Sequence, residues 1–142
     1  MILASDDQLR SILARPRRVA VLGAKEGTYE AAFYVPAYLC ARGWPVVGVN
    51  PKLAGREWLG APAVASLAEL SPVEIIDVFR RPDLVPGHVD EILALSWRPA
   101  VVWLQLGIRH DGAAQRLCDA GIDVVQDRCM MPEHRRLVRQ SA

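Results

Sequence analysis

The sequence predicts an α/β domain with a doubly wound, five-stranded parallel sheet and helices on both of its faces. Two observations lead to this prediction. Five short apolar runs are spread along the chain, and segments with apolar residues at helical spacing separate them. The length of 142 residues, of which 51% are hydrophobic, suits a single domain with one core. Strands and helices that alternate in this way favour parallel strands joined by right-handed crossovers.

The five apolar runs have the composition of buried strands. They are rich in β-branched residues and are followed by glycine, proline or polar turn residues. The expected strands cover residues 18–22, 46–49, 73–79, 100–104 and 122–125. The segment from 50 to 60 contains many turn residues and is expected to be a loop.

Helix start and stop signals flank the segments between the strands. Ser5 and Gln8 have the spacing of a capping box, and Pro16 ends this first helix. Gly43 and Gly121 stand where the C-terminal caps of two further helices belong. The expected helices cover residues 5–15, 31–42, 88–95, 111–120 and 132–139, with a short helical turn at 66–70.

The charge balance and the apolar runs exclude several classes of protein. The 17 Lys and Arg nearly match the 16 Asp and Glu, so we expect no general attraction to nucleic acid or to a membrane surface. No apolar run approaches the roughly 18 residues that suggest a membrane span. Met1 is followed by Asp6 and Asp7 without a basic or long apolar leader region. We therefore expect a soluble, cytoplasmic protein.

Cysteine and histidine spacing indicates neither a disulfide framework nor a metal site. The three cysteines form no CxxC pair, and their odd number argues against a secreted, cross-linked protein. The three histidines lie far apart in the sequence, without the spacing of metal ligands. We expect reduced cysteines and no bound metal.

In a parallel sheet of this kind, ligands bind beyond the carboxyl ends of the strands. The turn at 23–28 follows the first strand and leads into a helix, whose free N–H groups can bind an anion; a tight connection without a ligand is an equal alternative. The turn contains neither GxGxxG nor the phosphate-loop motif, and Asn50 stands where a dinucleotide site has an acidic residue. Binding of NAD is therefore disfavoured.

Other strand ends carry polar groups as well. Arg80 and Arg81 can pair with phosphate, although a charged pair in a loop is more commonly just solvated. Gln105 can form hydrogen bonds with a ligand. Asp127 and Arg128 are interpreted as a structural ion pair. These polar groups are expected to converge on one edge of the sheet, which favours a ligand site there.

Three further side chains have both a structural and a functional interpretation. Asp77 is interpreted as a residue that sets a turn. Cys129 is either a reactive thiol or, more commonly, an inert buried cysteine. His134 either touches the site or is a helix-terminal or solvated histidine.

Several short motifs follow one another along the chain. They are V-L-G-A at 21–24, Y-V-P-x-Y-L at 34–39, V-N-P at 49–51, D-V-F-R at 77–80, W-L-Q-x-G-I at 103–108 and D-R-C-M at 127–130. Together they resemble the small stand-alone CoA-binding protein family, which is similar to the CoA-binding domain of the succinyl-CoA synthetase alpha subunit. The resemblance implies one Rossmann-like domain over residues 1–142 that binds coenzyme A or an acyl-CoA.

The resemblance also implies where CoA is held. The turn after the first strand would meet the phosphates, the V-N-P loop and the D-V-F-R end would flank the adenosine part, and the L-Q-x-G turn would face the pantetheine. The residues implied in binding are Gly23, Ala24, Lys25, Gly27, Thr28, Asn50, Pro51, Lys52, Val78, Phe79, Arg80, Gln105, Gly107 and Ile108.

The expected function is binding without catalysis, because no Ser-His-Asp arrangement, metal cluster or close carboxylate pair is present in the sequence pattern. An alternative is a protein-interaction module, natural or engineered, with weakened CoA binding. Glu30 stands where the family usually has Arg, and tyrosine and tryptophan are favoured at interfaces. The candidate interface residues are Tyr29, Phe33, Trp58, Trp97 and Leu106. A third class, an enzyme using NAD(P), lacks its glycine and acidic determinants.

Overall fold

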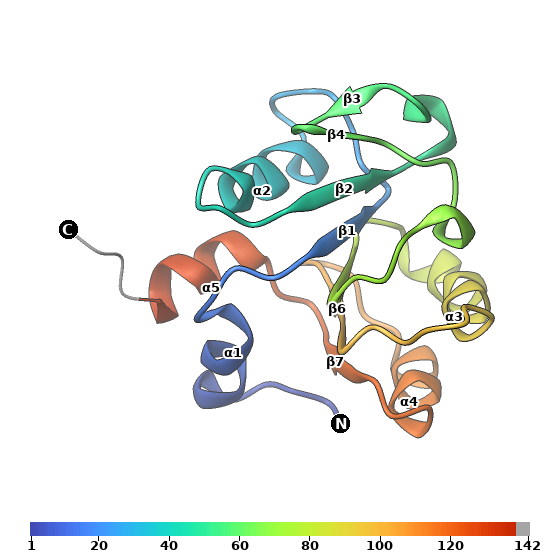
Figure 1. Cartoon of the computed structure of the whole chain (residues 1–142). Coiled ribbons are helices and arrows are strands. Elements are labelled where there is room, and N and C mark those ends of the chain that lie inside the picture. The colour runs from blue at the N-terminus through green and yellow to red at the C-terminus, as the bar shows by residue number, and fades with distance from the viewer. Residues whose placement is uncertain (139–142) are drawn as a thin grey trace.

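Five parallel strands form the central sheet of the computed structural model, which describes residues 1–138 (Figure 1). The sheet order is β2-β1-β5-β6-β7. The strands are β1 (Val19–Leu22), β2 (Val46–Val49), β5 (Ile75–Val78), β6 (Val101–Leu104) and β7 (Asp123–Val125). The chain moves outward from β1 to β2 and then returns to the other side of β1 at β5. The switch point in strand order therefore lies between β1 and β5.

The register of the parallel strands places the carboxyl ends of β1, β2 and β5 side by side. Val21 lies beside Gly48 of β2 and Asp77 of β5, and Leu22 lies beside Val49 and Val78. All of these pairings are parallel. The turns that follow β1, β2 and β5 consequently meet at the carboxyl edge of the sheet.

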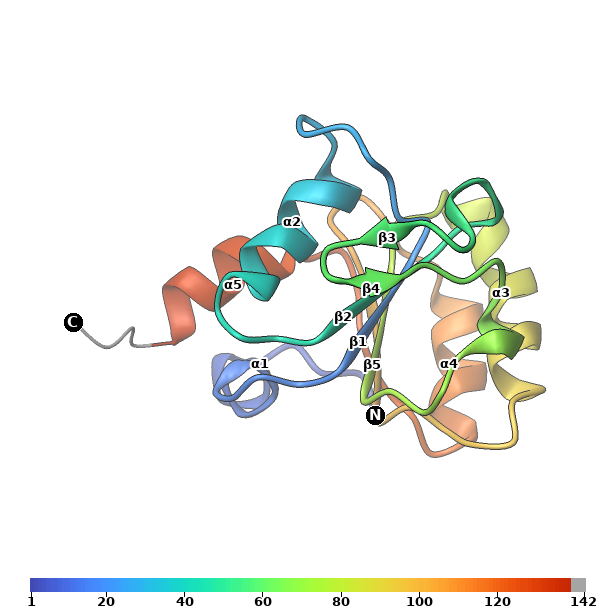
Figure 2. The same ribbon diagram turned by 45° about the horizontal axis from the view of Figure 1, so that its top comes forward.

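Helices cover both faces of the sheet, as the sequence predicts (Figures 1 and 2). One layer holds α1 (Asp6–Leu13), α2 (Ala31–Cys40) and α5 (Met130–Leu137); the other holds α3 (Val85–Leu93) and α4 (Asp111–Asp119). The capping box that begins α1 is present, with the Ser5 side chain accepting from Gln8 N–H. Three short 3-10 helices, η1 (Pro51–Leu53), η2 (Leu67–Glu69) and η3 (Pro82–Leu84), lie in the connections. η2 confirms the helical turn expected at 66–70.

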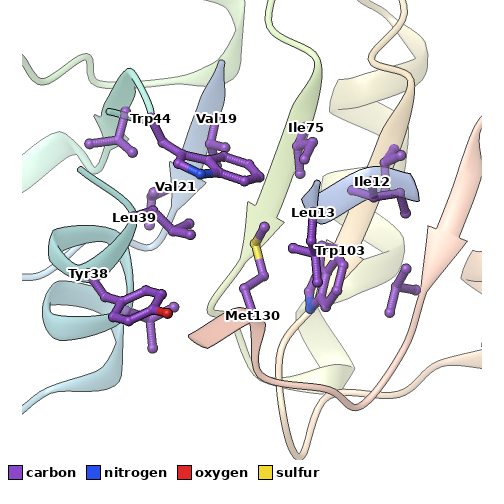
Figure 3. Packing of buried hydrophobic residues seen from close by; sticks show 14 of the residues in the cluster. Ile12, Leu13, Val19, Val21, Tyr38, Leu39, Trp44, Ile75, Trp103 and Met130 are labelled. Atoms are coloured by element: carbon purple, nitrogen blue, oxygen red, sulfur yellow. The ribbon is translucent and has the colours of Figure 1, made fainter. Parts of the chain in front are cut away.

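The core below α1, α2 and α5 contains the largest fully buried side chain of the described residues, Trp103 of β6. Figure 3 shows Met130, at the start of α5, between Leu39 of α2 and Leu13 of α1. Trp103 Nε1 donates a hydrogen bond of 2.7 Å to the backbone oxygen of Arg128. This contact ties the segment before α5 to the sheet and thereby places the start of α5 at the carboxyl edge.

A small hairpin replaces part of the loop expected between the second and third strands. It pairs β3 (Glu57–Trp58) with β4 (Ala61–Pro62), and Leu59 and Gly60 both have positive φ in the turn. Strands of two residues are too short to show the alternation of apolar and polar residues by which strands are detected. The hairpin is held by Trp58, whose side chain is buried against Gly48 of β2.

Some predicted boundaries differ from those observed. The helix expected at 88–95 begins earlier, at Val85, because Pro86 is tolerated in a first helical turn. The last helix, expected at 132–139, begins at Met130 and ends at Leu137; residue 139 lies outside the described residues. Over residues 1–138, no helix has the length and apolar character needed to cross a membrane.

Candidate functional site

A pocket of about 400 Å³ opens at the carboxyl edge of the sheet, between the ends of β5 and β6 and the first turn of α2. Cations, one carboxylate and apolar side chains share its wall. The lining residues are Lys25, Glu30, Ala31, Ala32, Tyr34, Phe79, Arg80, Arg81, Gln105, Leu106, Ile108 and Cys129. We call this the carboxyl-edge pocket.

Another hollow, of about 350 Å³, lies beside the outer edge of β2 and the hairpin. Trp44, Val47 and Leu70 are among its lining residues. None of the site or interface residues expected from the sequence lines it. Parallel sheets bind ligands at the carboxyl edge, so the candidate site is the carboxyl-edge pocket.

Several residues implied in CoA binding meet in this pocket. They are Lys25, Phe79, Arg80, Gln105 and Ile108, which come from the turn after β1 and from the ends of β5 and β6. Val78 does not line it, because its side chain is 1% exposed and packs in the core below α3 and α4. Alternation along a strand explains the difference, since neighbouring residues point to opposite faces.

The turn after β1 lies directly against the end of β5. Gly23 has φ +88°, and a Cβ at this position would lie 2.6 Å from the backbone oxygen of Phe79. Only glycine combines this conformation with so close an approach. Ala24, which follows, is fully buried, whereas Gly27 and Thr28 are exposed and do not line the pocket.

The loop after β2 supports this turn. Asn50 Nδ2 donates a hydrogen bond of 2.9 Å to the backbone oxygen of Ala24, and Asn50 Oδ1 accepts one of 2.9 Å from Lys52 N–H. Pro51 and Lys52 are exposed beside the turn and do not line the pocket. Asn50 therefore joins the two loops within the protein, and Lys52 stands further out.

The electrostatics of the pocket favour an anion. Lys25 Nζ lies 3.7 Å from Glu30 Oε1, and Arg81 Nε lies 3.4 Å from Asp83 Oδ1. Arg80 is exposed and has no ion-pair partner among residues 1–138. No side chain among residues 1–138 caps the N-terminus of α2, and Ala31 and Ala32 of its first turn line the pocket.

Asp77 corrects one sequence interpretation, because it lies inside β5 and sets no turn. The carboxyl group is fully buried, and Gln105 Nε2 donates a hydrogen bond of 2.6 Å to its Oδ1. Burial raises the pKa of Asp77 to about 8, although the hydrogen bond from Gln105 opposes the shift. Gln105 itself is 3% exposed and lines the pocket.

The expected ion pair between Asp127 and Arg128 is not formed. Asp127 Oδ1 accepts a hydrogen bond of 2.6 Å from Gly107 N–H, and Arg128 Nη1 lies 3.5 Å from Glu133 Oε1. The backbone of Asp127 has φ +55°, which turns its side chain back toward the loop after β6. Asp127 thus fixes the turn that contains Gly107 and Ile108.

His134 is neither solvated nor part of the site. It is 5% exposed on α5, and its Nδ1 lies 2.8 Å from Tyr38 Oη. Burial lowers the pKa of His134, and the neighbouring Arg42 guanidinium lowers it further.

Cys129 is half-buried at the pocket, and burial raises the pKa of its thiol. In the described part of the chain, no group of three or more His, Cys, Asp or Glu is placed to hold a metal ion.

The candidate interface residues divide into exposed and buried ones. Tyr29 is 96% exposed and Leu106 is 71% exposed. Trp58 is 4% exposed, so the expectation that it is a surface anchor is wrong: it fills the space above Gly48. Phe33 and Trp97 are half-buried and pack against the two core clusters.

Other pocket residues have no counterpart in the residues that the resemblance implies. Tyr34 is 40% exposed and reaches the pocket from the first turn of α2, and Arg81 reaches it from the loop after β5. A signal for Tyr34 exists in the sequence, because the first turn of a helix that follows a strand lies at the carboxyl edge. Arg81 is a predicted phosphate partner by its position at a strand end, although the family motifs do not include it.

Comparison with known proteins gives the family. Residues 17–135 match the family described as "CoA binding domain". The chain is 33% identical over 131 residues to the uncharacterized protein YneT of Bacillus subtilis (strain 168), covering 92% of this chain and 94% of the relative. The structure of cell-free ID.343 from Thermus thermophilus is 49% identical, with a TM-score of 0.88, and covers 94% of this chain and 99% of that one. A hypothetical protein from Pyrococcus horikoshii OT3 is 32% identical, with a TM-score of 0.84 and coverage of 94% and 92%. The chain is a member of the CoA-binding domain family.

Proposed function

We propose that the chain binds coenzyme A or an acyl-CoA in the carboxyl-edge pocket and carries out no chemistry on it. The observation that carries this proposal is the combination of three cations with an uncapped helix N-terminus at one opening. CoA has a diphosphate and a ribose phosphate, and both kinds of group suit guanidinium, ammonium and backbone N–H donors. Membership of the family supports the same ligand.

Arg80 is the strongest candidate for a phosphate contact. Its guanidinium has no carboxylate partner among residues 1–138, so a phosphate would not have to displace one. Lys25 Nζ lies 3.7 Å from Glu30 Oε1. The positive charge of Lys25 therefore offsets part of the repulsion between the Glu30 carboxylate and an anionic ligand. The apolar side chains of Phe79, Leu106 and Ile108 offer surface to the uncharged parts of CoA.

The titratable groups near the pocket support binding without catalysis. A thiol with a raised pKa, as in Cys129, is a poor nucleophile at neutral pH. Asp77 is shielded from the pocket by burial, and the imidazole of His134 is held by Tyr38. None of these groups has the exposed, activated geometry of a general base or nucleophile.

Titration calorimetry with CoA tests the proposal. We expect saturable binding to the wild-type chain and about tenfold weaker binding to Arg80→Ala, because one charge-assisted hydrogen bond is lost. Arg98→Ala is the matched control, since Arg98 is exposed at the amino end of β6, away from the pocket. A folded wild-type protein that gives no saturable heat with CoA would contradict the proposal.

The exposed side chains beside the pocket favour one other function, binding of a protein partner. Tyr29 and Leu106 together present large apolar surface on the same face as the pocket. Native mass spectrometry of protein purified from cells would show CoA, a partner chain or neither. For this second function we expect Tyr29→Ala and Leu106→Ala to weaken binding of a purified partner; unchanged binding would exclude the role of this surface.

A further inference from the structure

The carboxyl of Asp77 is a fully buried polar group in the sheet. It lies in the middle of the sheet, beside Val21 of β1 and Trp103 of β6. Its Oδ2 is the one buried side-chain oxygen or nitrogen of the described residues that lacks a hydrogen-bond partner. An unpartnered polar atom in an apolar core is destabilising. A residue that costs stability in this way needs another explanation.

Gln105 connects this carboxyl to the carboxyl-edge pocket. Its Nε2 donates to Asp77 Oδ1 at 2.6 Å, while its side chain lines the pocket. Gln105 Oε1 has no hydrogen-bond partner among the described residues, yet it is not a buried unpartnered atom. Gln105 Oε1 therefore retains some accessible surface, and its side chain belongs to the wall of the pocket. The two ends of an amide point in different directions, so holding the nitrogen inward fixes the oxygen outward.

We propose that Asp77 is a positioning residue that orients the side-chain amide of Gln105, so that Gln105 Oε1 accepts a hydrogen bond from an N–H group of the bound ligand. This inference rests on the proposed function. Without the contact from Asp77, the amide could turn and present its NH₂ group instead. CoA has N–H donors in the amide groups of the pantetheine arm and in the adenine amino group, and we assign this acceptor to the pantetheine amides. Adenosine 3′,5′-bisphosphate has the nucleoside of CoA, its 3′-phosphate and the first phosphate of its diphosphate, but it lacks this arm.

The test compares these two ligands by calorimetry in two variants of Asp77. Asp77→Val removes the acceptor for Gln105 Nε2, and we expect about five- to tenfold weaker binding of CoA. Binding of adenosine 3′,5′-bisphosphate is expected to stay unchanged. Asp77→Asn keeps a carbonyl acceptor in the same place and should restore the affinity for CoA. The melting temperature of Asp77→Val measures the balance between losing the unpartnered Oδ2 and leaving Gln105 Nε2 without its acceptor.

Gln105→Met provides a second route to the same answer if Asp77→Val does not fold. It removes the amide and leaves Asp77 in place, and we expect the same loss for CoA alone. The double variant with Asp77→Val and Gln105→Met should bind CoA no more weakly than either single variant, because both substitutions remove the same contact with the ligand.

The possible results separate the inference from the proposed function. Unchanged CoA affinity in Asp77→Val or in Gln105→Met would overturn the inference and leave the proposed function standing. Equal losses for both ligands would also overturn it, because the amide would then act on the whole site. A wild-type chain that binds neither ligand would overturn the proposed function and this inference together.

Discussion

Trp58 Nε1 donates a hydrogen bond of 2.9 Å to the backbone oxygen of Lys25, which joins the β3–β4 hairpin to the turn after β1. The ring of Trp58 also lies edge-on to Phe33 of α2, with 6.5 Å between centroids. The hairpin thereby braces both the turn and the helix that form one wall of the pocket.

Trp58→Phe should weaken this brace while keeping an aromatic side chain in the space. We expect the free energy of unfolding to fall by about 1–2 kcal/mol, from the lost hydrogen bond and the smaller ring. CoA affinity should fall severalfold, because Lys25 is then less well placed. Urea denaturation and calorimetry measure the two effects.

Trp97→Phe is the matched control for this prediction. Trp97 is half-buried and packs against the core cluster below α3 and α4, away from the turn. The Trp97→Phe variant should have a lower free energy of unfolding and an unchanged affinity for CoA. Equal losses of affinity in both variants would mean that Trp58 has no particular relation to the site.

Glu30→Gln should increase the affinity for CoA. The carboxylate lies at the pocket, 3.7 Å from Lys25 Nζ, and removing its charge frees the lysine and ends a repulsion with phosphate. We expect about three- to tenfold tighter binding in low salt and a smaller gain in high salt. Stability should fall by about 0.5 kcal/mol, because a negative charge at the N-terminus of α2 favours the helix.

Asp119→Asn is the control for the charge change itself. Asp119 ends α4, at the edge of the sheet opposite to the pocket. Its removal changes the net charge by the same amount and should leave CoA affinity within twofold of the wild-type value. If both variants gain equally, the effect comes from overall charge and not from Glu30.

The strands and helix layers can be predicted because their signals are local. β1 and β5 are apolar runs because both faces of a parallel sheet are covered, and the caps of α1 lie within a few residues of each other. The hairpin cannot be predicted in this way, because Trp58 is fixed by Gly48, which belongs to a strand of another sheet. Two residues per strand carry no periodic signal.

The sequence predicts at which strand ends the site lies, but it predicts less well which individual side chains line the pocket. The topology alone places Lys25, Arg80 and Gln105 at one edge. Asp77, by contrast, resembles a turn residue in sequence because its environment depends on which strands flank it. The register beside Val21 and Trp103 turns this carboxyl into a buried group, and no single stretch of sequence contains that information.

Asp77 should make stability depend on pH in a defined direction. In the folded chain its pKa is about 8, whereas the carboxyl of the unfolded chain releases its proton near the ordinary value of 3.8. Between these values the unfolded state binds fewer protons, so the free energy of unfolding falls as pH rises, by about 1.4 kcal/mol per pH unit. This contribution is fully present below about pH 4 and is lost as pH rises through the folded pKa.

Asp77→Asn isolates this effect, because the amide does not titrate. The difference in unfolding free energy between the variant and the wild type should grow in favour of the variant by about 3 kcal/mol from about pH 5 to about pH 7. Urea denaturation at the two values measures it, and the other carboxylates cancel in the difference. A difference that stays constant with pH would show that Asp77 titrates normally in the fold.

His134 of α5 should make stability depend on pH in the opposite direction. Its pKa is lowered by burial and by Arg42, whose guanidinium lies 3.5 Å from the Tyr38 ring centroid. Near the ordinary imidazole value of 6.5, the folded chain therefore binds fewer protons than the unfolded chain. The stability that this difference contributes is present above that pH and is lost as pH falls through the lowered folded pKa.

His134→Asn removes this dependence, because the amide cannot take up the proton. We expect the variant to be about 1–2 kcal/mol less stable than the wild type at about pH 7.5, because it loses ring contacts to Tyr38 and Trp44. At about pH 5.5 the unfolding free energy of the variant should approach that of the wild type. Only the wild type has a histidine at position 134, and its protonation in the unfolded chain lowers the free energy of unfolding. Chemical denaturation at both pH values decides the matter: a gap that does not narrow on acidification would mean that the buried imidazole is protonated as easily in the fold as in the unfolded chain.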